Sequence, residues 1–352
     1  MSQTNTFKVV EPNQIPARIS VIIWDVNGTI TFKDQLDEEV IKEILQSAAQ
    51  GVQHIFITGR DRAWLVDFFV IGLREIAGKA NIDYQKAISN MWLYPELGLI
   101  FLEPPSLTPI IYEGVKDHPW VISPLRKRIA TLFWQVDKLQ EWKEGDKIPS
   151  RFYIIRDANR KAYLHPLVFE DVSVDIKLPD FIWSDTKEII GTAEIIREND
   201  NQISPRRRAK IDSAVQILEA LLEYLEIKTI SISPVSTAIN IAPIVDGVAL
   251  DKDWATGRAL THLAKQKGWD LNRVIQQTIG IGDGMADFLF SYPIINGKAE
   301  TNIPFVFVGP AELEVPQKQK ANTIIWSEKE FSGPAVTKDV LIFLKEKMQP
   351  FS

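Results

Sequence analysis

The sequence predicts an α/β protein whose parallel-sheet core is interrupted along the chain by an inserted α+β domain. Near both ends of the chain, short apolar runs alternate with amphipathic helical segments, which is the pattern of a parallel sheet covered by helices. Between the two ends, aromatic residues and alternating apolar and polar residues are more frequent. We therefore predict a discontinuous core domain, residues 1–82 and 240–352, and an inserted domain, residues 83–239.

Four segments form the first part of the predicted core. Residues 19–24 and 54–60 begin as continuous apolar runs, as expected for strands that are buried on both faces, and each leads into a turn. Residues 36–50 are predicted to be a helix, because apolar residues recur with helical spacing and Gly51 follows as a stop. Residues 62–73 are predicted to form a second helix.

The C-terminal part of the chain has the same character. Residues 256–267 are predicted to form a helix that ends at Gly268. Residues 278–284 read as a strand followed by a turn, and residues 303–309 as another apolar strand. Residues 333–348 are predicted to form the closing helix. These elements complete a Rossmann-like core.

The middle of the chain has a different pattern. Residues 151–157 and 172–178 alternate between apolar and polar side chains, as the half-buried strands of an antiparallel sheet do. Residues 209–226 form a long amphipathic pattern with apolar residues on one helical face. The insert is therefore predicted to be an α+β domain with its own core.

Composition excludes several classes of function. With 40 basic and 46 acidic residues among 352, the chain lacks the basic balance of a protein that binds nucleic acid through a positive surface. It has no cysteine, which excludes disulfides and thiolate metal sites. No leader-like apolar segment and no run of ~20 apolar residues is present, so we expect a cytoplasmic protein without a membrane span. The sequence makes no prediction about the oligomeric state.

Polar residues follow the predicted core strands at the point where each strand ends. Asp25 follows the first strand, Thr58 the second, and Asp283 and Asp287 a later one, while Lys252 precedes a predicted helix. Because ligands bind at the carboxyl ends of parallel strands, we expect these side chains to lie together. An aspartate can attack phosphorus, Mg²⁺ prefers carboxylate oxygens, and a hydroxyl and an ammonium group can hold phosphoryl oxygens. The set therefore predicts phosphoryl transfer.

This ordered set resembles the motifs of the haloacid dehalogenase superfamily of phosphohydrolases, and the resemblance covers essentially the whole chain. It implies that Asp25 is the catalytic nucleophile and that Thr58, with Gly59 and Arg60 in the same turn, binds the phosphoryl group. Lys252 would stabilise both the nucleophile and the phosphate. A dehalogenase is less favoured than a phosphatase, because a lysine and two late aspartates suit a metal-bound phosphate.

The same resemblance implies a cofactor and a substrate class. Mg²⁺ would be held by the carboxylates of Asp25, Asp283 and Asp287 and by the backbone carbonyl of Asn27. The insert resembles the type IIB cap of sugar phosphatases, and Glu96 lies where that group has a turn that can contact a substrate hydroxyl. The implied function is a Mg²⁺-dependent phosphatase that acts on a small phosphorylated metabolite, a sugar phosphate, through an aspartyl-phosphate.

One residue departs from this pattern. Asn27 stands where phosphatases of the family carry a second aspartate, which protonates the leaving oxygen and then activates water. An amide donates and accepts hydrogen bonds but cannot exchange a proton near neutral pH. General acid–base catalysis contributes roughly 10²–10⁴-fold, so the resemblance implies turnover slowed by about that factor.

Three explanations of Asn27 remain open at this stage. The first is a substrate-trapping substitution of aspartate by asparagine. The second is a natural enzyme that is slow, uses an unusually good leaving group, or recruits another acid such as His118 or His165. The third is a catalytically impaired protein that binds a phosphorylated ligand or a protein partner.

Overall fold

The computed structural model divides the chain into two compact units, residues 1–112 with 250–352 and residues 113–249. The residues described are 15–32, 35–130, 132–133, 140–142, 152–156, 162–166, 178, 180–184, 186–195, 205–235, 238–245, 247–299, 303–309, 323–325 and 333–351. The first unit thus retains residues 83–112, which the sequence analysis gave to the insert, because they extend its sheet.

The first unit contains an eight-stranded sheet in the order β20-β19-β16-β1-β4-β5-β6-β7. Six strands are parallel: β1 (Val21–Trp24), β4 (Gln53–Ile57), β5 (Met91–Tyr94), β16 (Thr278–Gly282), β19 (Phe305–Phe307) and β20 (Thr323–Ile325). The edge strands β6 (Ile100–Glu103) and β7 (Thr108–Ile111) are antiparallel. The predicted parallel core is confirmed, and the strand expected over 303–309 is shorter.

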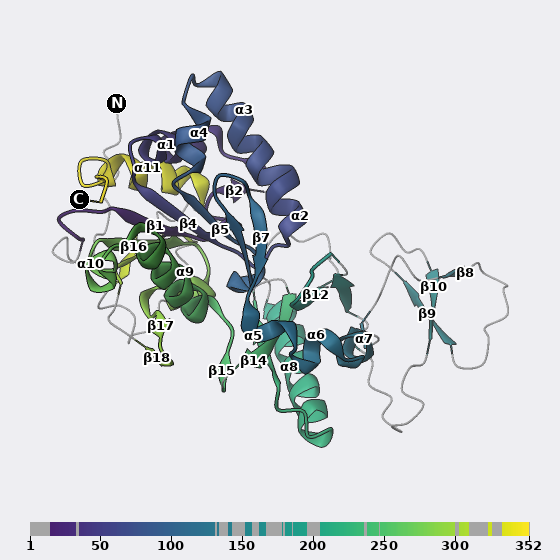
Figure 1. Ribbon diagram of the computed structural model, residues 1–352. Coiled ribbons are helices and arrows are strands. Elements are labelled where there is room, and N and C mark those ends of the chain that lie inside the picture. The colour runs from purple at the N-terminus through teal and green to yellow at the C-terminus, as the bar shows by residue number, and fades with distance from the viewer. Residues whose placement is uncertain are drawn as a thin grey trace. The chain divides into compact units, whose positions relative to one another are not determined.

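Helices cover both faces of this sheet (Figure 1). One face carries α1 (Glu38–Ala49), α3 (Ile71–Lys79), α4 (Tyr84–Ile88) and α11 (Pro334–Leu344). The other carries α9 (Lys252–Lys267) and α10 (Leu271–Gln276). Every residue of β1 and β4 is buried, as the continuous apolar runs predicted.

Two predicted helices begin or end differently in the structure. The helix expected over 62–73 is a continuous helical segment formed by α2 (Arg62–Trp64), the wider turn η2 (Leu65–Val70) and α3. The helix expected from residue 256 begins at Lys252, after the Asp251 carboxylate accepts a hydrogen bond from the Lys252 N–H. It ends at Gly268, whose φ of 68° favours glycine. Lys252 therefore lies in the first turn of α9.

Short elements complete the first unit. They are β2 (Thr31–Phe32), β3 (Gln35–Leu36), β17 (Ile294–Ile295), β18 (Lys298–Ala299) and the 3₁₀ turns η3 (Glu96–Gly98) and η5 (Met285–Ser291). η3 follows β5, and η5 follows β16. Both turns lie beyond the carboxyl ends of parallel strands, where ligands bind in such sheets.

The second unit is an α+β domain, as predicted. Its main sheet is antiparallel and contains β11 (Phe181–Ser184), β12 (Gly191–Ile195), β13 (Ile230–Pro234), β14 (Ala238–Val245) and β15 (Val248–Ala249). Its helices are α5 (Glu113–Lys116), α6 (Pro119–Ile122), α7 (Leu125–Ala130) and α8 (Pro205–Tyr224). A three-stranded antiparallel sheet consists of β8 (Gln140–Trp142), β9 (Phe152–Arg156) and β10 (Ala162–Pro166).

The strand expected over 151–157 is β9, whereas the one expected over 172–178 lies outside the described residues except for Leu178. In the described part of the chain, none of the helices has the length and apolarity needed to cross a membrane.

A buried histidine links the central strands to α1. Trp24 Nε1 donates to His54 Nδ1 at 3.0 Å, and His54 Nε2 lies 3.0 Å from Ser47 Oγ. Because an indole N–H only donates, Nδ1 is the acceptor and Nε2 carries the proton of a neutral ring. Ser47 Oγ in turn donates to the carbonyls of Glu43 and Ile44. Burial lowers the pKa of His54 to about 3.

We expect acid to weaken the fold through His54. In the unfolded chain the ring binds a proton at its ordinary pKa of 6.5, whereas in the folded chain its pKa is about 3. The unfolded state therefore binds more protons, and the free energy of unfolding falls as the pH drops through this window, by up to about 1.4 kcal/mol per pH unit. Urea unfolding of the chain and of His54→Gln across the window measures the effect. The variant should show a shallower slope, and equal slopes would contradict the assignment.

Candidate active site

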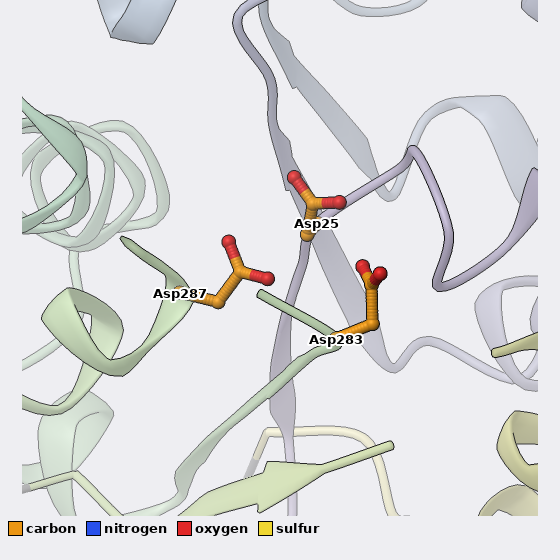
Figure 2. A group of neighbouring side chains, drawn as sticks. All are labelled: Asp25, Asp283 and Asp287. Atoms are coloured by element: carbon orange, nitrogen blue, oxygen red, sulfur yellow. The ribbon is translucent and has the colours of Figure 1, made fainter. Parts of the chain in front are cut away.

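Three carboxylates converge at the carboxyl edge of the central strands. Asp25 directly follows β1 and Asp283 directly follows the neighbouring parallel strand β16, while Asp287 lies in the turn η5. Figure 2 shows the three side chains lying near one another. One oxygen from each lies within 4.8 Å of the others. Asp25 and Asp287 are buried, and Asp283 is partly buried.

Glycines make this close approach possible. A Cβ atom at Gly28 would lie 2.1 Å from Asp283 Oδ2, and one at Gly282 would lie 2.4 Å from Asp287 Cβ. Gly28 also has a φ of 81°, a conformation that side chains disfavour. The glycine of the first motif thus leaves room for the aspartate of the last one.

Local hydrogen bonds orient two of the carboxylates. Thr29 Oγ1 donates to Asp283 Oδ1 at 2.9 Å, so the loop after β1 also holds the aspartate after β16. The Gly284 N–H donates to Asp287 Oδ2 at 2.7 Å. Each carboxylate is fixed by a donor from the turn beside it, which preorganises the group.

Lys252 joins two of the carboxylates. Its ammonium group donates to Asp25 Oδ1 at 2.7 Å and also to Asp287 Oδ1. The side chain is about one-tenth exposed, so this ion pair is largely removed from solvent. Burial alone would lower the pKa of Lys252, but the charges of Asp25 and Asp287 raise it above its ordinary value. Lys252 is therefore a fixed positive charge in the site.

The site contains more acidic groups than basic ones. Burial raises the pKa of Asp25 to about 7, Lys252 opposes this shift, and Asp287 adds to it. Burial and the neighbouring Asp25 and Asp287 charges raise the pKa of Asp283 well above its ordinary value. Three carboxylates face one ammonium, so a bound cation would offset the mutual repulsion. A cluster of hard oxygen donors with this surplus of charge suits Mg²⁺.

The predicted phosphate-binding turn follows β4. Thr58 is fully buried, and its Oγ1 accepts a hydrogen bond from the Arg60 N–H at 3.1 Å across Gly59. The turn is joined to η3, since the Leu97 N–H donates to the Thr58 carbonyl at 2.9 Å and the Glu96 N–H donates to the Arg60 carbonyl at 3.0 Å. The second motif and the Glu96 turn therefore form one connected loop structure.

Asn27 contacts Arg60. Arg60 Nε donates to Asn27 Oδ1 at 3.0 Å, and the guanidinium group stacks on the Trp64 ring with its carbon 4.9 Å from the ring centre. This Asn27–Arg60 pairing was not predicted from the sequence. No sequence signal indicated it, because the two residues come from different strand ends.

Glu96 is fully buried in a strained turn. Glu96 and Leu97 have positive φ values of 51° and 55°, which are uncommon for residues with side chains.

Arg258 of α9 contacts this turn. It donates to the Gly98 carbonyl, and its guanidinium carbon lies 4.9 Å from the centre of the Tyr112 ring. Arg258 was missed by the sequence analysis, because its contacts come from segments that are distant along the chain.

His118, one of the two histidines considered as replacement acids, makes contacts within the second unit. His118 Nδ1 accepts from the Trp120 N–H at 3.1 Å, and Nε2 lies 3.1 Å from the Ile244 carbonyl. Both ring nitrogens are thus used within the second unit. The side chain of His165 lies outside the described residues.

No protein-family model and no curated protein matches the sequence. Solved structures do match. The C-terminal domain of trehalose-6-phosphate phosphatase from C. albicans is 14% identical over 94% of this chain and 93% of that chain, with a TM-score of 0.51. A haloacid dehalogenase-like hydrolase from Bacteroides thetaiotaomicron is 13% identical over 93% and 100% of the two chains, with a TM-score of 0.49.

At these identities the likeness concerns the fold. In this chain, that fold consists of a parallel α/β sheet with helices on both faces (Figure 1) and an inserted domain with antiparallel strands. The chain therefore shares the fold of that trehalose-6-phosphate phosphatase domain, and the predicted Rossmann-like core with an inserted α+β domain is confirmed.

Proposed function

We propose that the protein is a Mg²⁺-dependent phosphatase of the haloacid dehalogenase superfamily that acts on a small phosphorylated metabolite through an aspartyl-phosphate at Asp25. The observation that carries this proposal is the convergence of Asp25, Asp283 and Asp287 around Lys252 at the carboxyl edge of the sheet. The fold shared with a trehalose-6-phosphate phosphatase supports it, and sugar phosphates are the substrate class that the resemblance implies.

Asp25 is suited to attack phosphorus. Lys252 donates to its Oδ1, which favours the ionised carboxylate that a nucleophile must be. In the proposed reaction an Asp25 oxygen forms a bond to phosphorus while the bond to the leaving oxygen breaks. Water then attacks the phosphorus of the aspartyl-phosphate and regenerates the carboxylate. Lys252 and the Thr58 turn would stabilise the phosphoryl oxygens during both steps.

Asp25, Asp283 and Asp287, together with the Asn27 carbonyl, would hold Mg²⁺. The bound metal would supply positive charge for the phosphoryl oxygens of the transition state. The protein's own contribution is to fix the three carboxylates before the cation arrives, Asp283 and Asp287 through the Thr29 and Gly284 hydrogen bonds and Asp25 through Lys252. Lys252 lowers the repulsion among them but leaves a net negative charge for a divalent ion.

Asn27 separates binding from turnover in this proposal. Its backbone carbonyl serves a metal as well as that of aspartate, but its side chain supplies no proton. Binding of metal and phosphate would therefore be retained while hydrolysis is slow. The competing function, favoured by this one residue, is binding of a phosphorylated ligand or a protein partner without turnover.

In either case, the second unit would act as a cap domain that selects the substrate or ligand.

We expect Asn27→Asp to accelerate phosphate release. The substitution restores a group that can protonate the leaving oxygen, so the gain on a suitable sugar phosphate should be roughly 10²–10⁴-fold. The measurement is phosphate release from a panel of sugar phosphates with Mg²⁺. Asp25→Asn, which lacks the nucleophile, should be inactive and controls for contaminating phosphatases. If no variant releases phosphate from any compound, the binding function becomes the better account.

We also expect Mg²⁺ to stabilise the folded protein. Ligands that bind only the folded state raise stability with concentration, so the melting temperature should rise as Mg²⁺ is added. Asp283→Asn should weaken this rise because it removes one metal ligand. Asp270→Asn is a matched control, since it removes one charge at the start of α10 and keeps a side chain that can cap the helix. Equal responses of the two variants to Mg²⁺ would argue against the metal site.

A further inference from the structure

The Arg60–Asn27 contact fixes the direction of the Asn27 amide. The arginine side chain carries donors and no acceptor, so the amide oxygen must face Nε, at 3.0 Å. The amide NH₂ group therefore points away from Arg60, and Asn27 can offer a ligand only a hydrogen-bond donor on that side. As a neutral amide, Asn27 does not itself neutralise the charge of the Arg60 guanidinium group.

Arg60 is held in place from several directions. Its N–H donates to Thr58 Oγ1, and its carbonyl accepts from the Glu96 N–H at 3.0 Å. Its guanidinium group lies over the Trp64 ring. The backbone N–H of Trp64 in turn donates to Asp61 Oδ1 at 2.7 Å. Because backbone and side chain are both fixed, Arg60 keeps its charge and its hydrogen bond at one position in the site. It is a preorganised group rather than a solvated surface arginine.

We propose that Asn27 and Arg60 together select phosphoryl donors whose leaving group departs as an anion, namely acyl phosphates and phosphoric anhydrides. This inference rests on the proposed function, because it requires phosphoryl transfer to Asp25. Arg60 acts as a positioning residue for the Asn27 amide, and its charge favours negative charge developing on the leaving oxygen. The pair thus replaces proton donation with electrostatic stabilisation.

The chemistry of the leaving group explains this selection. In the transfer step a bond forms between an Asp25 oxygen and phosphorus, and the electron pair of the broken bond leaves with the bridging oxygen. An alcohol would depart as a strongly basic alkoxide unless it received a proton, which Asn27 cannot give. A carboxylate or a phosphate is stable as an anion near neutral pH, so an acyl phosphate or an anhydride needs no proton at this step.

The second step follows the same logic. Water attacks the phosphorus of the aspartyl-phosphate, the electron pair returns to the Asp25 oxygen, and a proton passes to solvent. With no base at position 27, this step lacks general-base assistance. Phosphorylated Asp25 should therefore accumulate when an acyl phosphate is supplied.

The test compares substrates that differ in their leaving group. Phosphate release is measured with Mg²⁺ for acetyl phosphate, glucose 6-phosphate and a series of substituted phenyl phosphates, using the chain and Asn27→Asp. The rate of phosphate release by the unsubstituted chain should depend steeply on the acidity of the leaving group. The ratio of the acetyl phosphate rate to the glucose 6-phosphate rate should be about 10²-fold larger for the chain than for Asn27→Asp. Acid-quenched samples of the unsubstituted chain should contain more phosphorylated protein than those of Asn27→Asp.

Substitutions of Arg60 test its part in the selection. Arg60→Gln should lower the acetyl phosphate rate by about 10²-fold, the order expected for loss of a charge-stabilising donor. Arg60→Lys keeps the charge and should retain part of the rate. Arg62→Gln is the matched control, because it removes an arginine two residues further along, in α2, and should leave the dependence on leaving group unchanged.

The outcomes separate this inference from the proposed function. If the chain and Asn27→Asp show the same ratio of acetyl phosphate to glucose 6-phosphate rates, the inference is wrong and the phosphatase remains. The same holds if only Asn27→Asp releases phosphate, or if Arg60→Gln matches Arg62→Gln. If neither the chain nor Asn27→Asp releases phosphate or becomes phosphorylated, the inference and the proposed function both fail.

Discussion

The buried ion pairs of Lys252 are the interaction on which the candidate site depends. The ammonium group bonds to Asp25 from the first motif and to Asp287 from the last, residues that lie 262 positions apart in sequence. Removing one partner of a buried ion pair costs about 3–5 kcal/mol, because the remaining charge is left without compensation. The start of α9 therefore fixes the two strand ends relative to each other. Two of the three carboxylates proposed to hold Mg²⁺ are positioned by this same contact.

The sequence predicted the parts of the fold that depend on local patterns. Continuous apolar runs identified β1 and β4, and helical spacing identified α1, because burial on two faces and on one face give different periodicities. The compact units divide after residue 112 rather than at the predicted residue 82. Residues 83–112 include β5, β6 and β7, which pair side by side at one end of the core sheet.

The sequence could predict which residues lie in the candidate site, but not which contacts they make. Asp25, Asp283 and Asp287 could be expected together, because all three follow strands that end at one edge of the sheet. The start of α9 at Lys252 rather than at residue 256 depends on the Asp251 cap, which the periodicity does not contain. Contacts between distant loops, such as Arg60 with Asn27, require the register of the sheet and cannot be obtained from spacing alone.

The Asn27 amide, which stands where the family carries an aspartate, has its direction set by a hydrogen bond. Here the amide oxygen accepts a hydrogen bond from an arginine whose backbone and side chain are both fixed. In the proposed mechanism, the nucleophile, the metal ligands and Lys252 do not depend on the side chain at position 27. The site could therefore keep them while the group that would face the leaving oxygen changes. This separation would allow the proposed phosphatase scaffold to exchange proton donation for positive charge, and the leaving group would determine which of the two is useful.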